Sequence, residues 1–197
     1  MSEDWVMSVP ARKHATYEDL CRLPSELRGE IIDGDLYAMP RPASPHIKVA
    51  SHLGGELYNP FFRGRGGPGG WWILDEPEVH LGPDVLVPDV AGWRKETLKD
   101  APDAKFYTTR PDWVCEVLSP STASLDRVKK WRVYESQQVP WLWLIDPIGR
   151  TLEAFERQGA AYVHLGTWGP GECPRIRPFE AIELELDALW GTEPIEP

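Results

Sequence analysis

Short apolar runs bounded by turn residues dominate the hydrophobic pattern of this chain. Residues 86–90 (Leu-Val-Pro-Asp-Val) and 113–118 (Trp-Val-Cys-Glu-Val-Leu) are two such runs, and each contains one carboxylate. Apolar runs of this length between Pro and Gly residues are typical of buried strands. The pattern therefore predicts that Asp89 and Glu116 lie in buried strands, where a carboxylate requires a cation or several hydrogen-bond donors.

A tight hairpin is predicted near the N-terminus. Asp33-Gly34 is a strong two-residue turn signal, and it lies between the strand patterns 30–32 and 35–37. The turn places Glu30 at the start of a strand. Taken alone, the local pattern favours an acid on an edge strand, facing water.

Thr16 and Asp19 predict the capping box of a short helix that ends at Pro24, and apolar residues at helical spacing predict a first longer helix from Ser44 to about residue 59. Ser44 is the expected N-cap, with Pro45 as the first helical residue. The predicted buried face consists of Ile47, Ala50, Leu53, Leu57 and Phe61. His46 falls on the packed side of the first turn, where a lone histidine is more often a hydrogen-bonded core residue than a ligand.

A second helix is predicted over about residues 124–136. Its predicted buried side is formed by Leu125, Val128 and Trp131. A separate line at four-residue spacing is formed by Asp126, Lys130 and Tyr134. From the residues alone, Asp126 and Lys130 form either a surface ion pair of little energetic value or part of a site.

The rest of the pattern predicts strands within one domain. Residues 71–81 are expected to form one strand that is broken or bulged around Pro77, and residues 92–110 form the longest irregular connection. The other predicted strands are 141–145, 151–155, 161–165 and the half-exposed 182–186. The predicted organisation is a loose arm (1–15), a single domain (16–190) and a C-terminal tail (191–197).

The composition narrows the function classes. The chain has 197 residues, enough for one domain with a real core, and a formal net charge of −10. This charge argues against a general nucleic-acid binder, whose affinity comes from Lys and Arg. It is compatible with a nuclease, because acids gather around metals and a local basic patch such as residues 127–132 can face a substrate.

Composition also bears on the compartment. The three cysteines are far apart and form no Cys-x-x-Cys, so neither a disulfide framework nor a structural zinc site is indicated. No apolar stretch approaches the roughly 20 residues of a membrane span, and the N-terminus lacks the order of a secretory signal. We therefore expect a cytoplasmic protein without a membrane partner.

Asp89, Glu116 and Lys130 together suggest a site. Two acids on neighbouring buried strands, with a lysine on the next helix, suggest a divalent metal with a phosphate or water beside it. Hydrolysis by a serine or cysteine nucleophile is disfavoured. The chain has no Gly-x-Ser-x-Gly, and Cys115 lies in mid-strand, where it is expected to be packed.

The order of these elements resembles that of restriction-endonuclease-like nucleases, whose signature is Pro-Asp, a gap, then Asp or Glu, any residue and Lys. More closely, the chain resembles the Uma-two family of endonucleases. The matching stretches, spread over residues 16–165, are 29–36 (Gly-Glu-Ile-Ile-Asp-Gly-Asp-Leu), 44–46 (Ser-Pro-His), 87–90 (Val-Pro-Asp-Val), 115–122 (Cys-Glu-Val-Leu-Ser-Pro-Ser-Thr), Asp126 to Lys130 to Tyr134, and 139–147 (Val-Pro-Trp-Leu-Trp-Leu-Ile-Asp-Pro). The resemblance implies an α/β fold of the α+β kind, with a central mixed β-sheet flanked by helices and an N-terminal β-hairpin.

The resemblance also implies a metal-dependent endonuclease that hydrolyses phosphodiester bonds, with DNA as the expected substrate. Asp89 and Glu116 would hold Mg²⁺ (or Mn²⁺), and the main-chain oxygen of Val117 would complete that set. Glu30 matches the family's early acid and would bind the metal through water. The metal would lower the pKa of a bound water and neutralise charge on the scissile phosphate.

One departure from the nuclease signature concerns the lysine. The usual lysine lies two residues after the acid, where this chain has Leu118. The Uma-two pattern moves the lysine to the following helix, where Lys130 matches it and Lys129 is the alternative. Lys130 would orient the attacking water or meet the developing negative charge. His46 would contact the metal ligands without binding the metal itself, or it would contact the leaving group.

A second function class stays open. A catalytically silent nucleic-acid-binding or assembly module on a nuclease scaffold would account for the acidic composition and for Leu118. A homodimer is expected, because double-strand cutting needs two sites. Trp168 and Trp190 are predicted to be exposed and able to line its interface.

Overall fold

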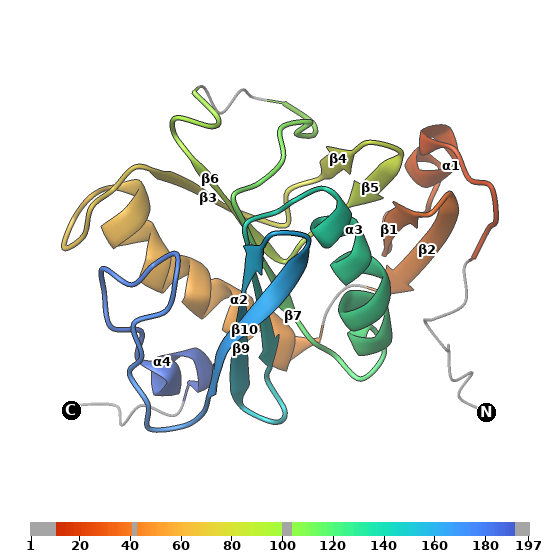
Figure 1. Ribbon diagram of the computed structural model, residues 1–197. Helices are drawn as coiled ribbons and strands as arrows, with labels where there is room; N and C mark the ends of the chain where they lie inside the picture. Colours follow the sequence, from red (N-terminus) through yellow and green to blue (C-terminus); the bar gives the residue numbers. More distant parts are fainter. Residues whose placement is uncertain (1–10, 41–42, 100–103, 192–197) are drawn as a thin grey trace.

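The computed structural model describes residues 11–40, 43–99 and 104–191, which form two β-sheets with helices packed against them (Figure 1). The helical segments are α1 (Tyr17–Cys21), α2 (Ser44–Leu57), α3 (Trp131–Ser136), α4 (Leu186–Trp190) and the π-helical η1 (Tyr58–Phe62) and η2 (Leu125–Lys130). The strands are β1 (Leu27–Ile32), β2 (Asp35–Pro40), β3 (Trp71–Asp75), β4 (Val79–Leu81), β5 (Asp84–Leu86), β6 (Val90–Arg94), β7 (Trp113–Val117), β8 (Trp141–Asp146), β9 (Thr151–Gln158) and β10 (Ala161–Trp168).

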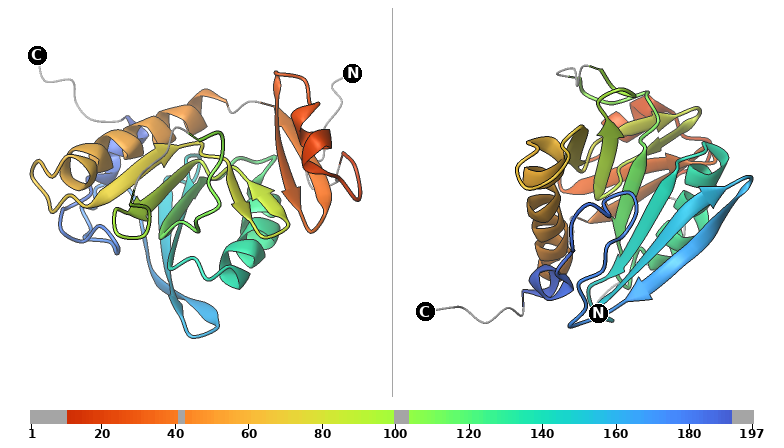
Figure 2. Two further views of the ribbon diagram at one scale, coloured as in Figure 1. Left: turned by 90° about the horizontal axis from the view of Figure 1, so that it is seen from above. Right: turned by 60° about the vertical axis from the view of Figure 1, so that its left-hand side comes forward.

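The larger sheet has the strand order β10-β9-β8-β7-β6-β3. β7 and β8 pair in parallel and the other neighbours pair antiparallel, so the sheet is mixed. α2 and α4 pack on one face of this sheet and α3 on the other (Figure 2). The predicted fold class, a mixed sheet flanked by helices with an N-terminal hairpin, is confirmed.

The side chains of β7 alternate between the two faces of the larger sheet. Trp113, Cys115 and Val117 belong to the core under α2, whereas Val114 belongs to the core under α3. Successive side chains of a strand point to opposite faces. Glu116 therefore points to the α3 side of the sheet.

The smaller sheet, with the order β2-β1-β5-β4, contains the predicted hairpin. Its turn residues Asp33 and Gly34 have φ angles of +55° and +78°, as a two-residue hairpin turn requires.

The predicted single strand 71–81 is wrong, because β3 belongs to the larger sheet and β4 to the smaller one, with Pro77 between them. Asp89 is likewise not within a strand. It lies where the chain crosses from β5 in one sheet to β6 in the other.

The water-facing edge position that the local pattern favours for Glu30 is wrong. β1 is an inner strand of the small sheet, because β2 and β5 pair with its two sides. Glu30 is 0% exposed. Its side chain is contacted by Lys130 of η2 and by the backbone N–H of Val87, both distant in sequence, so no local pattern around Glu30 indicates the burial.

α2 differs from the prediction in its first turn. Ala43 is the N-cap in place of Ser44, and it makes no side-chain capping bond. The buried residues of this helix are His46, Val49, Leu53 and Leu57. Ile47 is 51% exposed. His46 lies on the buried stripe with Val49 and Leu53, so Ile47, one residue further along the helix, points away from the core.

The second predicted helix buries Leu125 and packs Trp131 against the core, as predicted, but Val128 is not part of its buried side. Val128 is 44% exposed, whereas Asp126, Lys130 and Tyr134 are buried. The first half of this helix, η2, is π-helical, with i to i+5 hydrogen bonds in place of the regular α-helical pattern. The four-residue line of polar residues therefore faces the sheets.

Four smaller predictions also change. Residues 182–186 form no strand but an irregular segment that leads into α4, and the supposed loop 92–110 begins inside β6. Trp168 and Trp190 are half-buried against the core of their own chain. Of the predicted arm, residues 11–15 make backbone hydrogen bonds to the hairpin, while residues 1–10 and the tail 192–197 lie outside the described residues.

No helix within 11–40, 43–99 and 104–191 is both long enough and apolar enough to cross a bilayer.

Gly92 of β6 lies where a side chain has no room. A Cβ atom there would lie 3.1 Å from Cε3 of Trp113 and 3.3 Å from atoms of Ile73 and Trp71. We expect Gly92→Ala to lower the free energy of unfolding by about 1–3 kcal/mol, because packed side chains must move. Gly55→Ala, on α2 with no atom within 4 Å of the added Cβ, is the control and should gain about 0.5–1 kcal/mol. Equal stabilities of the two variants in denaturant unfolding would contradict this packing.

Candidate functional site

The five predicted site side chains lie around the junction of the two sheets. Glu30 is on β1, Asp89 is in the crossing between β5 and β6, and Glu116 is near the end of β7. His46 comes from the first turn of α2 and Lys130 from the end of η2. All five are buried, with exposures between 0% and 7%.

The inner half of this cluster consists of Lys130 and the carboxylates of Glu30, Glu116 and Asp126 that surround it. The Nζ atom of Lys130 lies 2.9 Å from Oε1 of Glu30 and 2.7 Å from Oε1 of Glu116. Oδ1 of Asp126 is 3.7 Å away, and Lys130 also donates to the carbonyl oxygen of Val87 at 3.4 Å. Burial by itself would lower the pKa of this lysine, but the surrounding carboxylates raise it above its usual range. Lys130 is therefore a buried cation.

Glu116 has a second partner on the same helix. The hydroxyl of Tyr134 donates a hydrogen bond to its Oε1. Burial raises the pKa of Glu116 well above its usual range, although the Lys130 cation opposes this rise. Burial likewise raises the pKa of Asp126 to about 6, again against the effect of Lys130. The inner half thus holds more carboxylates than its one lysine neutralises.

The outer half of the cluster consists of Asp89 and its two side-chain partners, His46 and Arg28. Oδ2 of Asp89 accepts a hydrogen bond from the backbone N–H of Val117 at 2.7 Å and lies 3.1 Å from Nε2 of His46. Oδ1 of Asp89 lies 3.1 Å from Nη1 of Arg28, on β1. Burial alone would raise the pKa of Asp89, but the His46 hydrogen bond and the charges of Arg28 and Lys130 lower it to about 2. Asp89 is therefore ionised.

The backbone of two short segments joins the halves. Val117, whose N–H binds Asp89, is the residue after Glu116. Val87, two residues before Asp89, donates from its N–H to Oε1 of Glu30 at 2.8 Å. Asp89 is contacted by a side chain from α2, that of His46. Glu116 is contacted by Lys130 and Tyr134, from the helix on the other side of the sheet.

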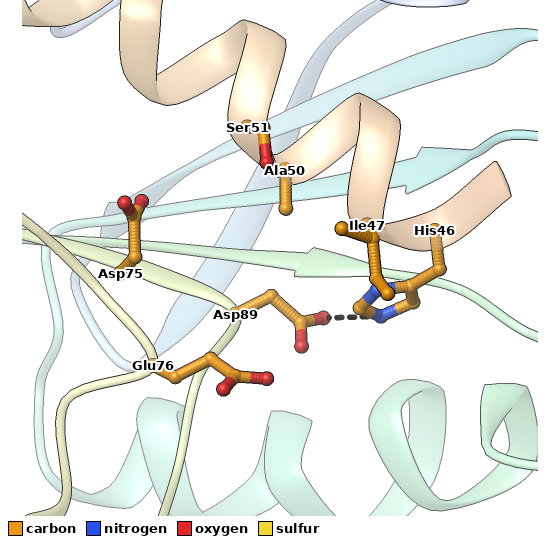
Figure 3. A pocket seen from close by; sticks show the side chains of 7 residues that line it. All are labelled: His46, Ile47, Ala50, Ser51, Asp75, Glu76 and Asp89. Carbon is orange, nitrogen blue, oxygen red and sulfur yellow. Dashed lines mark hydrogen bonds and ion pairs between the residues drawn. The ribbon is translucent and has the colours of Figure 1, made fainter. Parts of the chain in front are cut away.

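A pocket of about 300 Å³ opens beside Asp89 (Figure 3). One wall is α2, which contributes His46, Ile47, Ala50 and Ser51. The other wall carries Asp75 and Glu76 at the end of β3, and the Asp89 carboxylate lies between the two walls. The pocket gives a ligand access to Asp89, which is otherwise buried.

The donor set and its charge fit a hard divalent cation. The four carboxylates of the cluster are those of Glu30, Asp89, Glu116 and Asp126, and its two cationic side chains are Arg28 and Lys130. With all four carboxylates ionised, two negative charges are in excess. Oε2 of Glu30 is also buried without a hydrogen-bond partner. Carboxylate oxygens are the ligands that Mg²⁺ prefers.

The cluster is not arranged as a finished metal shell. In the part of the chain that the structure describes, no three His, Cys, Asp or Glu side chains are grouped as a metal-binding set. Arg28 and Lys130 hold Asp89 and Glu116 instead. A metal at this junction therefore has to share these oxygens with the two cations or displace them.

Several contributors to the cluster were not predicted as site residues. Asp126 and Tyr134 share the helix line of Lys130, so their four-residue spacing indicates them. Arg28 is two residues before Glu30, and alternate residues of a strand share a face, so the hairpin pattern also carries a signal for it. Glu76 carries no such signal, because its contact with Arg28 depends on how the two sheets meet.

Comparisons with known proteins agree with this fold. The family model described as "Uma2: Putative restriction endonuclease" matches residues 14–188. Among solved structures, one titled a "putative nuclease belonging to DUF820 from Anabaena variabilis ATCC 29413" is similar, with a TM-score of 0.72 and 20% sequence identity. The match covers 90% of this chain and 98% of that chain. At this identity the likeness shows the fold alone. The comparison with curated proteins finds no match.

Proposed function

Because the chain belongs to the Uma2 restriction-endonuclease family, we propose that it is a metal-dependent endonuclease that hydrolyses phosphodiester bonds in DNA. The observation that carries the proposal is the buried cluster of Asp89, Glu116 and Lys130, with carboxylates in excess of its cations. A buried excess of negative charge is costly unless a cation compensates it. A divalent metal supplies that charge and also the chemistry of the family.

Asp89, Glu116 and the main-chain oxygen of Val117 would hold Mg²⁺ or Mn²⁺, with Glu30 contacting it through water. When bound, the metal would activate a water molecule and neutralise charge on the phosphate. Tyr134 and Lys130 both bind Glu116 and fix the orientation of its carboxylate. Tyr134 and Lys130 would thus restrict the position of Glu116 when a metal binds.

Lys130 is proposed as the group that meets developing negative charge on the phosphate or orients the attacking water. Its three carboxylate neighbours keep it protonated, so it acts as a fixed cation and not as a proton acceptor. Glu30 positions it, since Oε1 of Glu30 also accepts from the N–H of Val87. Lys130 thereby takes the role of the lysine that is absent at Leu118.

His46 has two proposed roles. Its Nε2 atom and the N–H of Val117 both contact Oδ2 of Asp89, which leaves Oδ1 as the oxygen available to a cation. His46 also lines the pocket beside Asp89, where a leaving group would be within its reach.

The direct test is cleavage of circular DNA, which has no ends for an exonuclease. Supercoiled plasmid and circular single-stranded DNA are incubated with the purified chain and Mg²⁺, Mn²⁺ or a chelator. We expect nicked or linear products with either metal and none with the chelator. Glu116→Gln, purified in the same way, should be inactive and controls for contaminating nucleases. Intact substrates with both metals across a range of salt would contradict the proposal.

A second candidate function is a catalytically silent nucleic-acid-binding module. The specific observation in its favour is that Arg28 and Lys130 already bind the two carboxylates that a metal would need. Tight DNA binding without turnover, together with no Mn²⁺ binding in calorimetry, would support this function over the nuclease.

We also propose that the chain acts as a homodimer, because one site per chain cuts one strand. Sedimentation equilibrium should then give twice the chain mass of 22.3 kDa. A single species of the monomer mass at the concentrations of the cleavage assay would contradict dimerisation.

A further inference from the structure

We propose that Arg28 is a built-in cation that competes with the metal for Asp89, and that Glu76 is the carboxylate to which Arg28 retreats when the metal binds. The inference rests on the proposed function, since it concerns the metal that this function requires. It assigns roles to two residues outside the predicted metal ligands.

The hydrogen bonds of Asp89 leave one oxygen for a metal. Oδ2 accepts from the N–H of Val117 at 2.7 Å and contacts Nε2 of His46 at 3.1 Å. A carboxylate oxygen has about two lone-pair sites, so Oδ2 is fully used. Oδ1 is the oxygen that Arg28 contacts, through Nη1 at 3.1 Å. A metal held by Asp89 would therefore compete with the guanidinium of Arg28 for Oδ1.

Arg28 already contacts Glu76, the carboxylate that it would keep as a partner when a metal binds Asp89. The same Nη1 nitrogen lies 3.0 Å from Oε1 of Glu76. The Glu76 side chain is 46% exposed, whereas the Asp89 side chain is 3% exposed. Arg28 thus stands between a buried and a solvent-facing carboxylate. It can give up Asp89 and keep an ion pair.

The backbone keeps the two carboxylates of this exchange together. The N–H of Glu76 donates to the carbonyl oxygen of Asp89 at 3.0 Å. The side chains of both residues line the 300 Å³ pocket, through which a cation reaches Asp89. The retreat of Arg28 therefore needs a side-chain movement and no rearrangement of the sheets.

The contact of Arg28 with Asp89 is that of an exchangeable pair. A permanent arginine–carboxylate pair is commonly bidentate, with two parallel N–H···O bonds. Arg28 instead contacts Asp89 through the single nitrogen Nη1 that it shares with Glu76, and its Nε is buried without a partner. Two cations on one carboxylate oxygen repel each other strongly in a buried site. Metal binding and the Arg28–Asp89 pair therefore oppose each other.

The test is calorimetric titration of the full chain with Mn²⁺ in the absence of DNA. Arg28→Gln should bind Mn²⁺ roughly tenfold more tightly than the wild type, because the competing charge is gone. Glu76→Gln should bind it more weakly, because Arg28 then has Asp89 as its remaining carboxylate partner. In the double variant R28Q/E76Q the Glu76 substitution should lose most of its effect, since it acts through Arg28.

Asp75→Asn is the matched control for charge. It removes one carboxylate from the same pocket and leaves both ion pairs of Arg28 in place. Glu76→Gln should therefore weaken Mn²⁺ binding clearly more than Asp75→Asn does. Equal effects of these two exposed substitutions would overturn the proposal, and this comparison holds even if Arg28→Gln does not fold. An Arg28→Gln variant that folds and binds Mn²⁺ no more tightly than the wild type would overturn it as well.

Cleavage assays run in parallel separate this inference from the proposed function. Metal-dependent cleavage by the wild type, with equal Mn²⁺ affinities in all folded variants, overturns the competition and leaves the nuclease function standing. The expected pattern of affinities without cleavage supports the competition and contradicts the nuclease function. No Mn²⁺ binding by the wild type or by Arg28→Gln overturns both.

Discussion

Lys130→Met is expected to lower the free energy of unfolding by about 3–5 kcal/mol, the largest loss that we expect from a single substitution in this chain. The amine of Lys130 is within 2.9 Å of Glu30 and Glu116, and none of these three side chains is more than 1% exposed. Methionine fills the same volume but leaves both carboxylates, and Asp126 nearby, without their cation. The protein then has to bury uncompensated charge or protonate the acids.

The control for this loss is Lys129→Met, the neighbouring lysine on the same helix. Its ammonium group lies 5.5 Å from the centre of the Tyr37 ring, in a partly exposed position. We expect less than about 1 kcal/mol from this change. Urea unfolding of both variants gives the comparison. A Lys130→Met variant as stable as Lys129→Met would show that the buried ion cluster is absent in solution.

A double-mutant cycle makes the expectation sharper. If Lys130 is stabilising because it neutralises Glu116, the double variant Lys130→Met with Glu116→Gln should recover part of the loss. Additive losses would mean that the two side chains do not interact.

Asp89→Asn is expected to abolish metal-dependent cleavage, which makes it the substitution with the largest expected effect on activity. The asparagine side chain has the shape of aspartate but no charge with which to hold a divalent ion. Its amide nitrogen, which cannot accept a hydrogen bond, would replace either the oxygen facing the N–H of Val117 or the oxygen facing Arg28, so one of these hydrogen bonds must break. We expect the cleavage rate with Mg²⁺ to fall to the rate measured with chelator.

Asp84→Asn is the matched control for Asp89→Asn. Asp84 is another buried aspartate nearby in the chain, and it accepts a hydrogen bond of 2.8 Å from the N–H of Asp33 at the hairpin turn. Its role is confined to the small sheet, so its substitution should affect stability and leave Mg²⁺-dependent cleavage in the folded fraction. Cleavage by Asp89→Asn at the rate of Asp84→Asn would show that Asp89 is not a metal ligand.

Features set by local chemistry were predictable from the sequence. The hairpin follows from Asp33-Gly34, since few residues adopt two consecutive positive φ angles. The strands around Glu116 and residues 141–145 follow from apolar runs whose short length and β-branched or aromatic residues favour buried strands. The embedded carboxylates of Asp89 and Glu116 are the clearest chemical signal, because such residues are rarely buried without a partner.

Features that depend on contacts between distant segments were not predictable. Glu30 is buried against Lys130 and the Val87 segment, which are distant in sequence, and the strand expected over residues 71–81 divides between two sheets. Val128 is exposed although α-helical spacing groups it with Leu125 and Trp131, and that spacing does not reveal the π-helical turns of η2. The ion pair of Arg28 with Glu76 likewise exists only after both sheets have formed.

The most direct measurement for the central claim is the anomalous scattering of Mn²⁺ in crystals of the full chain. In the proposed site, Asp89 and Glu116 would hold one divalent ion, with the amine of Lys130 beside it. We expect an anomalous peak in contact with both carboxylates, and Arg28 turned toward Glu76. Saturating Mn²⁺ with no peak at this junction, or a peak that touches neither Asp89 nor Glu116, would contradict the account.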